Sequence, residues 1–324
     1  MEVEDKTVEA LLNNRGSYVS CRQIAMQLGV SVSVIKRAVR ELRKLGYPIK
    51  SGRGLGYAII EFDTLSPNKI KQGLKTKVMG RIIHHFAHVG STQEIAKELA
   101  TQGAVEGTVI IAETQSAGRG RLGREWFSPA GGIWMSLLLS PKRSVQELQV
   151  LNLLAALAVS RSIEKACGLE ARIKWPNDIL IQGKKVAGIL SEAFAKGGIV
   201  SDVVLGVGIN ANVETEFFPF DLRLSATSLS ATLGNSVDRV TFVQSLLEEL
   251  ETLYEEFERE GSGFIISELK RLSTTLGRKV KVISFDEVAE GLAVDIHTDG
   301  ALVVRVEDGT TKLFYSGDVS IIES

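Results

Sequence analysis

The chain has 324 residues, with 38 lysines and arginines against 39 aspartates and glutamates, and its formal net charge is −1 at pH 7. This length predicts roughly two or three domains, each large enough to bury its own core, and the near-zero total charge by itself suggests no polyanionic partner. The chain has two cysteines, Cys21 and Cys167, no apolar leader, and a longest apolar stretch (150–159) about half the ~20 residues of a membrane span. We therefore expect a soluble cytoplasmic protein that is neither secreted nor membrane-bound.

Positive charge is concentrated near the amino end of the chain. Residues 15–60 contain nine lysines and arginines and a single acidic residue, Glu41, so this segment carries +8 while the remainder is net acidic. Such an asymmetry predicts that the amino-terminal part of the chain binds nucleic acid.

The segment 20–44 has the pattern of a helix-turn-helix. Ile24 and Leu28 lie on one face of a first expected helix, and the turn at 29–31 ends with Ser31, a natural N-cap. The second expected helix has apolar residues at spacings of three and four: Val32, Ile35, Val39 and Leu42. Its opposite face is basic: Lys36, Arg37, Arg40, Arg43 and Lys44. A second helix of this kind offers long basic side chains to a major groove.

Two short strands around a glycine- and arginine-rich turn, within residues 47–60, predict the wing of a winged helix. We therefore expect a winged helix-turn-helix domain over 1–62 and a linker or docking segment over 63–77. The residues expected to contact DNA are Ser31, Ser33, Lys36, Arg37, Arg40, Lys44 and Arg53. The alternative is a small helical domain with a solvated basic face, or one that binds protein. Phosphate contacts dominate affinity, so the preferred base sequence cannot be read from these residues.

A capping-box pattern predicts a helix that begins near residue 91. Ser91 is followed three positions later by Glu94, which is the spacing at which the two side chains cap each other's backbone amides. This structural role explains both residues. A helix amino terminus with spare hydroxyl groups is in addition a polar ligand site.

The segment 118–126 combines three arginines and three glycines and ends at Trp126. It satisfies G-x-G-x-x-G after an apolar run, but no helix follows and no acidic residue lies near position 139, so we reject a dinucleotide fold. A Walker phosphate loop is excluded because no Gly-Lys-Ser/Thr follows. A basic nucleic-acid patch remains the simpler alternative. The guanidinium group of arginine binds carboxylate or phosphate with two parallel hydrogen bonds, and glycine lets the backbone approach a ligand closely. We therefore expect this segment to form a flexible cover over an anion.

A second polar cluster lies at 174–178, with the sequence Lys-Trp-Pro-Asn-Asp. A strand-like run follows, then a turn at 183–185 and a strand over 186–192. A hairpin with solvated lysines is the simpler interpretation. A lysine, an amide and a carboxylate around one Trp-Pro step could instead bind ATP and its magnesium, and Lys185 could meet a substrate carboxylate as a point charge. The strand over 203–212 brings Asn210 to a strand end beside glycines.

The carboxy-terminal part changes from helical to strand patterning. Residues 241–260 predict an amphipathic helix with an apolar side formed by Leu246, Leu250, Leu253, Tyr254 and Phe257. From Lys279 onward apolar residues alternate, and Asp299-Gly300 and Asp308-Gly309 predict hairpin turns. Short antiparallel strands of this kind suggest a small SH3-like barrel. The four histidines have no matching cysteine or carboxylate spacing, so we expect no structural metal site.

Together, five spaced segments resemble the biotin protein ligase family: 90–92, 115–121, 174–178, 184–190 and 206–210. The resemblance runs through essentially the whole chain, and the amino-terminal domain is similar to that of the bifunctional members, which also repress transcription. It implies an α+β protein with a winged helix at 1–62, a central mixed α/β catalytic domain of the biotin/lipoate ligase type at 78–272, and an SH3-like β-barrel at 273–324.

The resemblance also assigns roles to individual residues. Biotin would be bound by Ser91, Thr92, Gln93, Gln115, Gly118, Arg119, Gly120, Arg121, Lys185 and Gly188. ATP and the adenylate would be bound by Arg124, Trp126, Lys174, Asn177, Asp178 and Asn210. The residues expected to act in catalysis are Arg119, Arg121, Lys185 and Asp178. One departure is Gln93, because the family usually has asparagine at that position.

The activity that the resemblance implies is ATP-dependent biotin–protein ligation with Mg²⁺, through biotinyl-5′-AMP, onto a lysine of a biotin carboxyl carrier protein. The same adenylate would act as corepressor for a homodimer that binds operator DNA. Two alternatives remain open: a lipoate-type ligase, and a biotin-sensing regulator without ligase activity.

Overall fold

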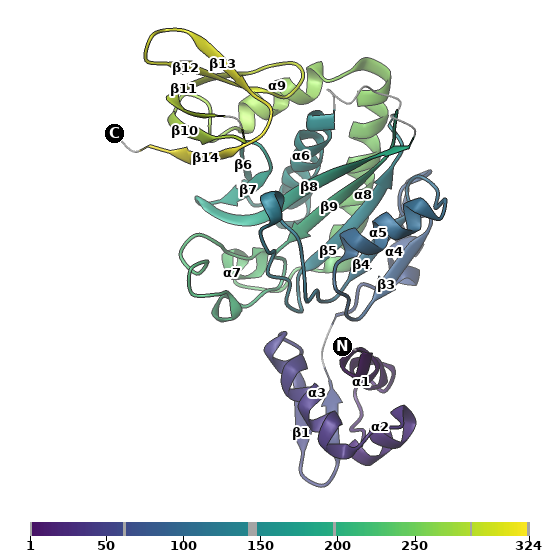
Figure 1. Cartoon of the computed structure of the whole chain (residues 1–324). Coiled ribbons are helices and arrows are strands. Elements are labelled where there is room, and N and C mark those ends of the chain that lie inside the picture. Colours follow the sequence, from purple (N-terminus) through teal and green to yellow (C-terminus); the bar gives the residue numbers. More distant parts are fainter. Residues whose placement is uncertain (1, 61–62, 142–147, 197–198, 286, 323–324) are drawn as a thin grey trace.

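The computed structural model describes residues 2–60, 63–141, 148–196, 199–285 and 287–322 (Figure 1). A helical amino-terminal domain, a central sheet covered by helices and a small carboxy-terminal β domain follow one another along the chain. In Figure 1 the first and the last of these lie at opposite ends of the central domain. This arrangement confirms the predicted α+β class.

The amino-terminal domain is a helix-turn-helix followed by a two-stranded antiparallel wing. Its elements are α1 (Glu2–Asn13), α2 (Cys21–Leu28), α3 (Val32–Lys44), β1 (Ile49–Gly52) and β2 (Gly56–Ile59). A capping box between Ser20 and Gln23 starts α2, and Gly29 ends it in the left-handed region at φ 66°. Ser31 stands at the N-cap of α3 as predicted, but its hydroxyl forms no cap hydrogen bond and instead lies 2.8 Å from the Ser33 hydroxyl.

Residues 63–77, expected as a linker or docking segment, pack onto the central domain. They contain helix α4 (Pro67–Gly73), and the fully buried Leu65 and Ile70 belong to the main hydrophobic core. The side chain of Gln244 donates to the main-chain carbonyls of Lys69 and Ile70, at 2.9 and 3.0 Å. This segment is therefore a structured part of the central domain's surface layer.

The central domain is built on a seven-stranded mixed sheet in the order β3-β4-β5-β9-β8-β7-β6. The strands are β3 (Ile83–Phe86), β4 (Val109–Ala112), β5 (Ile133–Leu139), β6 (Arg172–Lys174), β7 (Asp178–Ile181), β8 (Lys184–Lys196) and β9 (Ile199–Ile209). Only the β3–β4 pair is parallel among these strands as described. Lys184 and Lys185 belong to β8, so the turn expected at 183–185 lies instead at Gln182 and Gly183, both with positive φ.

Helices cover both faces of this sheet, but unequally. Helix α5 (Thr92–Thr101) packs alone on one face against Ile110, Leu138 and Val204. The long helices α6 (Leu148–Cys167) and α8 (Arg239–Glu260) cover the other face and form the main core. Much of the α5 face beside that helix therefore remains open, and the candidate site lies there. No helix within the described residues is long and apolar enough to cross a membrane.

The carboxy-terminal part follows α9 (Gly263–Leu272) and is a five-stranded antiparallel sheet in the order β13-β12-β11-β10-β14. Its strands are β10 (Lys279–Ile283), β11 (Val288–Ile296), β12 (Leu302–Val306), β13 (Thr311–Phe314) and β14 (Asp318–Ile321). The predicted turns are present, with Gly300 and Gly309 at φ 90° and 86°. The apolar side of this sheet joins the main core, so the two domains share one hydrophobic cluster.

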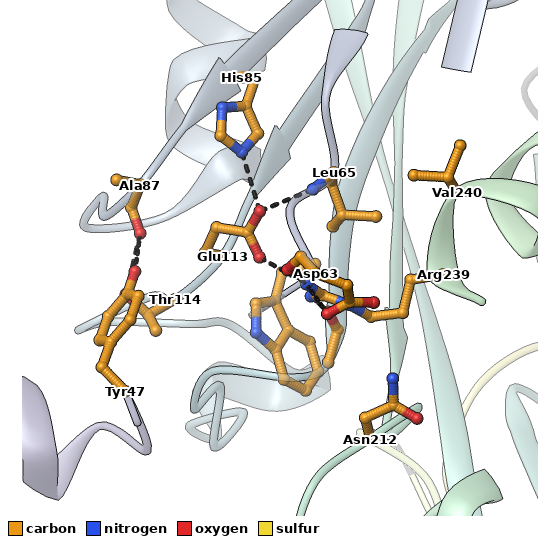
Figure 2. A network of polar contacts seen from close by, with 12 residues as sticks. Tyr47, Asp63, Leu65, His85, Ala87, Glu113, Thr114, Asn212, Arg239 and Val240 are labelled. Atoms are coloured by element: carbon orange, nitrogen blue, oxygen red, sulfur yellow. Dashed lines mark hydrogen bonds and ion pairs between the residues drawn. The ribbon is translucent and has the colours of Figure 1, made fainter. Parts of the chain in front are cut away.

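A buried ionic network ties the amino-terminal half of the chain to α8 (Figure 2). Arg239 and Glu113 have no exposed side-chain surface and lie 2.9 Å apart. The Arg239 guanidinium also binds the Asp63 carboxylate, at 2.7 to 3.0 Å, and the carbonyl of Gly132 at 2.8 Å. Burial by itself would raise the pKa of Glu113, but the charge of Arg239, the contact with His85 and the hydrogen bond from the Leu65 amide together outweigh burial and hold that pKa below its ordinary value.

Candidate functional site

A cavity of about 460 Å³ opens on the sheet face that carries α5, beside the amino terminus of that helix. Its floor is formed where β5, β9 and β8 are hydrogen-bonded side by side. Cross-strand neighbours in this floor are Gly208 with Gly188, and Gly206 with Leu190. Glycine at these positions leaves the floor without side chains, so a flat group can lie directly on the backbone.

In this structure the indole ring of Trp126 occupies part of that floor. A Cβ atom added to Gly208 would lie 2.6 Å from the Trp126 indole nitrogen, and one added to Gly188 would lie 2.8 Å from the ring. The ammonium group of Lys185 lies 5.0 Å from the centre of the ring, within cation–π range. Lys185 is also paired with Asp178 at 2.6 Å.

One wall of the cavity consists of short polar side chains at the start of α5. The side-chain oxygen of Gln115 accepts hydrogen bonds from the backbone amide and the hydroxyl of Thr92, at 2.8 and 3.1 Å. The Ser91 hydroxyl is buried and has no hydrogen-bond partner among the described residues. A buried hydroxyl without a partner is costly, and a polar ligand group in the cavity would satisfy it.

The capping box predicted at Ser91 and Glu94 is not formed. Ser91 is the N-cap residue of α5, as expected, but its side chain makes no cap bond. Glu94 turns instead to two cations, Lys97 at 2.9 Å and Arg119 at 3.0 Å. Two cations attract the carboxylate more strongly than one backbone amide does, which explains why Glu94 pairs with Lys97 and Arg119 and does not cap the helix.

Gln93 lines the cavity, but other protein groups already use its amide. Its nitrogen donates to the carbonyl of Val204 at 3.1 Å, and its oxygen accepts from the Ser136 hydroxyl at 2.9 Å. A Cβ atom at Gly206 would lie 2.6 Å from that oxygen, so the glycine makes room for the longer side chain. Gln93 therefore supports the floor rather than presenting a free amide.

The arginine-rich segment folds into a small hairpin above the floor. The Trp126 amide donates to the carbonyl of Gly118, and the Gly120 amide donates to the carbonyl of Arg124, each at 2.8 Å. Gly118 stands at the neck, where a Cβ atom would lie 2.4 Å from the Trp126 carbonyl oxygen. At the tip, Leu122 has φ 57°, an unusual conformation for a branched residue. The side chain of Leu122 is exposed.

Each arginine of this hairpin has a different protein partner. Arg119 pairs with Glu94 on α5, at 3.0 Å. Arg121 donates to the Asn177 side chain at 2.9 Å and to the carbonyl of Gly317 at 3.3 Å. The partner of Arg124 is Asp318, at the start of β14. The hairpin thus reaches from α5 across the cavity mouth to the carboxy-terminal domain.

The remaining polar residues of the site are positioned by the sheet. Asn177, in the turn between β6 and β7, donates to the carbonyl of Ile189 at 2.9 Å. Asn210 follows β9 directly, and its amide donates to the carbonyl of Thr227 at 3.0 Å.

Burial lowers the pKa of the Arg121 guanidinium, and the carboxylates of Asp318 and Asp178 oppose that effect. An arginine nevertheless stays protonated in proteins, so the cavity keeps a cationic roof.

The structure places the predicted ligand residues around one cavity. All of them line it except Gly118, which shapes the neck of the hairpin: Ser91, Thr92, Gln93, Gln115, Arg119, Gly120, Arg121, Arg124, Trp126, Lys174, Asn177, Asp178, Lys185, Gly188 and Asn210. Sequence reasoning did not single out Ser136, Phe218 or Asp318, which also line it. The glycines at alternate positions 206 and 208 were a usable signal, since residues two apart on a strand share a face.

The basic face of α3 forms the second candidate site. Lys36, Arg37, Arg40 and Lys44 are exposed, as are Ser31 and Ser33, and Arg53 lies in the turn between β1 and β2. Arg43 has a structural role, because it donates to the Ile49 carbonyl and the Ser51 hydroxyl and so holds the wing. A basic helix beside a two-stranded wing matches the shape of a duplex groove and its phosphates.

Three segments of the chain match known protein families. Residues 86–210 match the biotin/lipoate A/B protein ligase family, residues 4–58 match an HTH domain, and residues 275–321 match the biotin protein ligase C terminal domain. All three segments follow the domain order seen in the structure.

Individual relatives extend over nearly the whole chain. The bifunctional ligase/repressor BirA of Bacillus spizizenii is 39% identical over 319 residues, which cover 98% of both chains. The protein of the same name from Escherichia coli is 30% identical and also covers 98% of both chains. A biotin protein ligase from Aquifex aeolicus, solved with biotin and ATP, is 31% identical with a TM-score of 0.67, covering 75% of this chain and 100% of that one. The chain therefore belongs to the bifunctional ligase/repressor BirA family of biotin protein ligases.

Proposed function

We propose that this protein is an ATP-dependent biotin–protein ligase that also acts as a biotin-responsive transcriptional repressor. The observation that carries the ligase proposal is the composition of one cavity. It joins the unpartnered buried hydroxyl of Ser91, with the polar side chains of Thr92 and Gln115 beside it, to five cations: Arg119, Arg121, Arg124, Lys174 and Lys185. This is the environment that a polar head group with a carboxylate, held beside a nucleotide phosphate, requires.

In the first step an oxygen of the biotin carboxylate attacks the α-phosphorus of ATP. The new C–O–P linkage forms as the bond from the α-phosphorus to the bridging oxygen breaks, and pyrophosphate leaves with that electron pair. Two anions must approach each other, so Arg119, Arg121 and Lys185 lower the barrier by neutralising charge that builds up on the phosphoryl group. No proton has to be transferred, which agrees with a site dominated by cations.

In the second step the neutral amine of an acceptor lysine attacks the acyl carbon of biotinyl-5′-AMP. An amide C–N bond forms, the acyl C–O bond breaks, AMP leaves, and the amine proton passes to solvent. The mixed anhydride hydrolyses readily in water, so the arginine hairpin over the cavity protects it until the acceptor arrives. The acceptor is a biotin carboxyl carrier protein or domain.

Magnesium fits this site as a companion of ATP. Among the described residues no group of three or more histidine, cysteine, aspartate or glutamate side chains is arranged to hold a metal ion. The donor set suits an ion held mainly by phosphate oxygens and water, with the Asp178 carboxylate as a protein oxygen in the cavity wall. When bound, Mg²⁺ would neutralise part of the phosphate charge.

The exchange of labelled pyrophosphate into ATP tests the first step. We expect exchange that depends on biotin and is not supported by lipoate. Exchange with lipoate alone would favour a lipoate-type ligase. Tight biotin binding without exchange would favour a regulator that only senses biotin.

The repressor activity rests on the basic α3, the wing and the near full-length similarity to bifunctional relatives. One winged helix per chain reads one half-site, so we propose that the adenylate-bound protein dimerises and then binds an operator. Sedimentation with and without biotin and ATP tests dimerisation. Enrichment of duplexes from a random pool under the same two conditions tests operator binding, and equal enrichment in both would exclude control by the ligand. ATP, acceptor and operator DNA meet in the cytoplasm, where we place the protein.

A further inference from the structure

The guanidinium group that we assign to the biotin carboxylate already has a carboxylate partner in this structure. Arg119 lies 3.0 Å from the carboxylate of Glu94, and both side chains keep about half of their surface exposed, 50% and 41%. Glu94 lies in the first turn of α5, two residues after Thr92. Ser91 and Thr92 belong to the polar cavity wall that we assign to the biotin head group, called here the head-group wall. The pairing therefore connects the neck of the arginine hairpin to the head-group end of the cavity.

Glu94 is held in position by further charges and is not a freely moving surface group. The ammonium group of Lys97, one turn later on α5, lies 2.9 Å from Glu94 and 2.8 Å from Glu192 on β8. The Lys97 side chain is only 20% exposed, and the two carboxylates raise its pKa although burial opposes them. Lys97 therefore remains charged and fixes the Glu94 carboxylate where Arg119 can reach it.

We propose that Glu94 is the resting counterion of Arg119, and that the substrate carboxylate displaces it when biotin binds. This inference rests on the proposed ligase function. Both carboxylates are acceptors for the same guanidinium nitrogens, and two carboxylates beside one another repel. An exposed ion pair contributes little net free energy, so a substrate anion can replace Glu94 without a large penalty.

This exchange keeps the hairpin attached to α5 before substrate arrives and transfers Arg119 to the ligand afterwards. It also makes the site selective for anionic ligands, because a ligand without a negative charge cannot replace the ion pair between Arg119 and Glu94. Glu94 is thus a positioning residue, which acts on the substrate through Arg119 and does not touch it.

Calorimetric titration of the full-length protein with biotin and with biotinol, in which an alcohol replaces the carboxylate, tests the proposal. The variant Glu94→Gln keeps the shape of the side chain and removes its charge. We expect it to bind biotin about two- to fivefold more tightly than wild type and to bind biotinol unchanged. Weaker biotin binding, or an equal change for both ligands, would overturn the proposal.

Two controls separate the contact from a general effect of charge. Glu192→Gln removes a negative charge from the same cluster, but Glu192 touches Lys97 and not Arg119. We expect its effect on the biotin-to-biotinol ratio to be well below that of Glu94→Gln. In an Arg119→Met background Glu94→Gln should have no effect, and a persisting effect would show that Glu94 does not act through Arg119.

The outcomes also distinguish this inference from the function on which it rests. If wild type binds neither biotin nor biotinol, the proposed ligase function fails. If it binds biotin and supports pyrophosphate exchange, but Glu94→Gln leaves the biotin-to-biotinol ratio unchanged, only the role of Glu94 fails.

Discussion

The phenol of Tyr47 donates a hydrogen bond to the main-chain carbonyl of Ala87, across the contact between the winged helix and the central domain (Figure 2). Tyr47 follows α3 by three residues, and Ala87 lies four residues before Ser91. A second bond runs from the Ala130 amide to the carbonyl of Leu45, at 2.7 Å. The end of the basic helix is therefore attached to the segments that precede the head-group wall and follow the arginine hairpin.

Replacing Tyr47 with phenylalanine should weaken this attachment. The carbonyl of Ala87 would keep only the longer hydrogen bond from the Thr114 hydroxyl at 3.3 Å, so we expect the free energy of unfolding to fall by about 0.5–1.5 kcal/mol. Urea denaturation of the full-length protein measures the loss. Tyr18→Phe is the matched control, because Tyr18 is partly exposed on the same domain. Equal effects of the two variants would contradict a specific role for the Tyr47 hydroxyl.

Replacing the buried Arg239 with methionine should destabilise the protein strongly. Glu113 would lose the cation that compensates its burial, and breaking a buried pair costs about 3–5 kcal/mol. The double variant with Glu113→Gln should recover part of this loss, because the uncompensated charge is then gone. A double variant no more stable than Arg239→Met in chemical denaturation would contradict this explanation.

The same pair predicts a change in the pH dependence of stability. The pKa of Glu113 is held below its ordinary 4.5 in the folded protein, so its contribution is present above about pH 4.5 and is lost as the pH falls below that value. Without Arg239, burial dominates and raises this pKa. Stability in Arg239→Met should then be lost as the pH rises from about 4.5, and denaturation at pH 4 to 7 can detect the reversed slope.

Arg121→Gly should release the adenylate before transfer. Arg121 reaches Asn177 and the Gly317 carbonyl from the hairpin, so its loss removes the contact at the hairpin tip as well as a cation over the ligand. A charged hydrogen bond is worth about 1.5–3 kcal/mol, which corresponds to roughly 10- to 100-fold faster release. The ratio of pyrophosphate formed to acceptor biotinylated should rise, while DNA binding by residues 15–60 should persist. An unchanged ratio would exclude a retaining role.

Removing a positive charge from α3 should weaken DNA binding more when the side chain makes no ion pair with the protein than when it does. Arg40→Ala removes an exposed cation that makes no ion pair within the described residues, whereas Lys44 is already paired with Glu41 at 3.0 Å. We expect Arg40→Ala to reduce the slope of log affinity against log salt by about 1, and Lys44→Ala by less. Equal slopes for both variants and wild type would place the DNA elsewhere.

Gly208→Ala should disturb the nucleotide side of the cavity. The new methyl group would lie 2.6 Å from the Trp126 indole nitrogen and would force the ring off the floor. We expect a higher KM for ATP in pyrophosphate exchange, with a smaller change for biotin. Gly90→Ala is the control, because its Cβ would meet no atom within 4 Å. A similar rise in both variants would show that backbone stiffness, and not Trp126, is responsible.

Local motifs made much of this protein predictable. Short segments of the sequence indicate the helix-turn-helix and the hairpin turns. They also indicate nearly all residues around the cavity, because loops that bind anions need particular residues at close spacing. The domain order also followed from these segments, since each one identifies a single part of the chain.

Long-range contacts were not predictable in this way. Nothing near Tyr47 indicates Ala87, and nothing near Asp318 indicates that it meets Arg124 from another domain. The capping box at Ser91 failed for the same reason: the spacing to Glu94 was correct, but cations from elsewhere attract the carboxylate. The composition of residues 63–77 is polar and rich in lysine, and it gives no sign that Leu65 and Ile70 are buried in the main core.

The position of Asp63 determines where the two activities could be separated. It supplies a carboxylate to Arg239, yet it precedes every strand of the central sheet. Removing the winged helix by cutting before Asp63 would spare that carboxylate, whereas a cut after it would remove one of the two carboxylates that pair with Arg239. A ligase without its winged helix therefore has to begin at or before Asp63, although the family matches over 4–58 and 86–210 leave this residue unassigned.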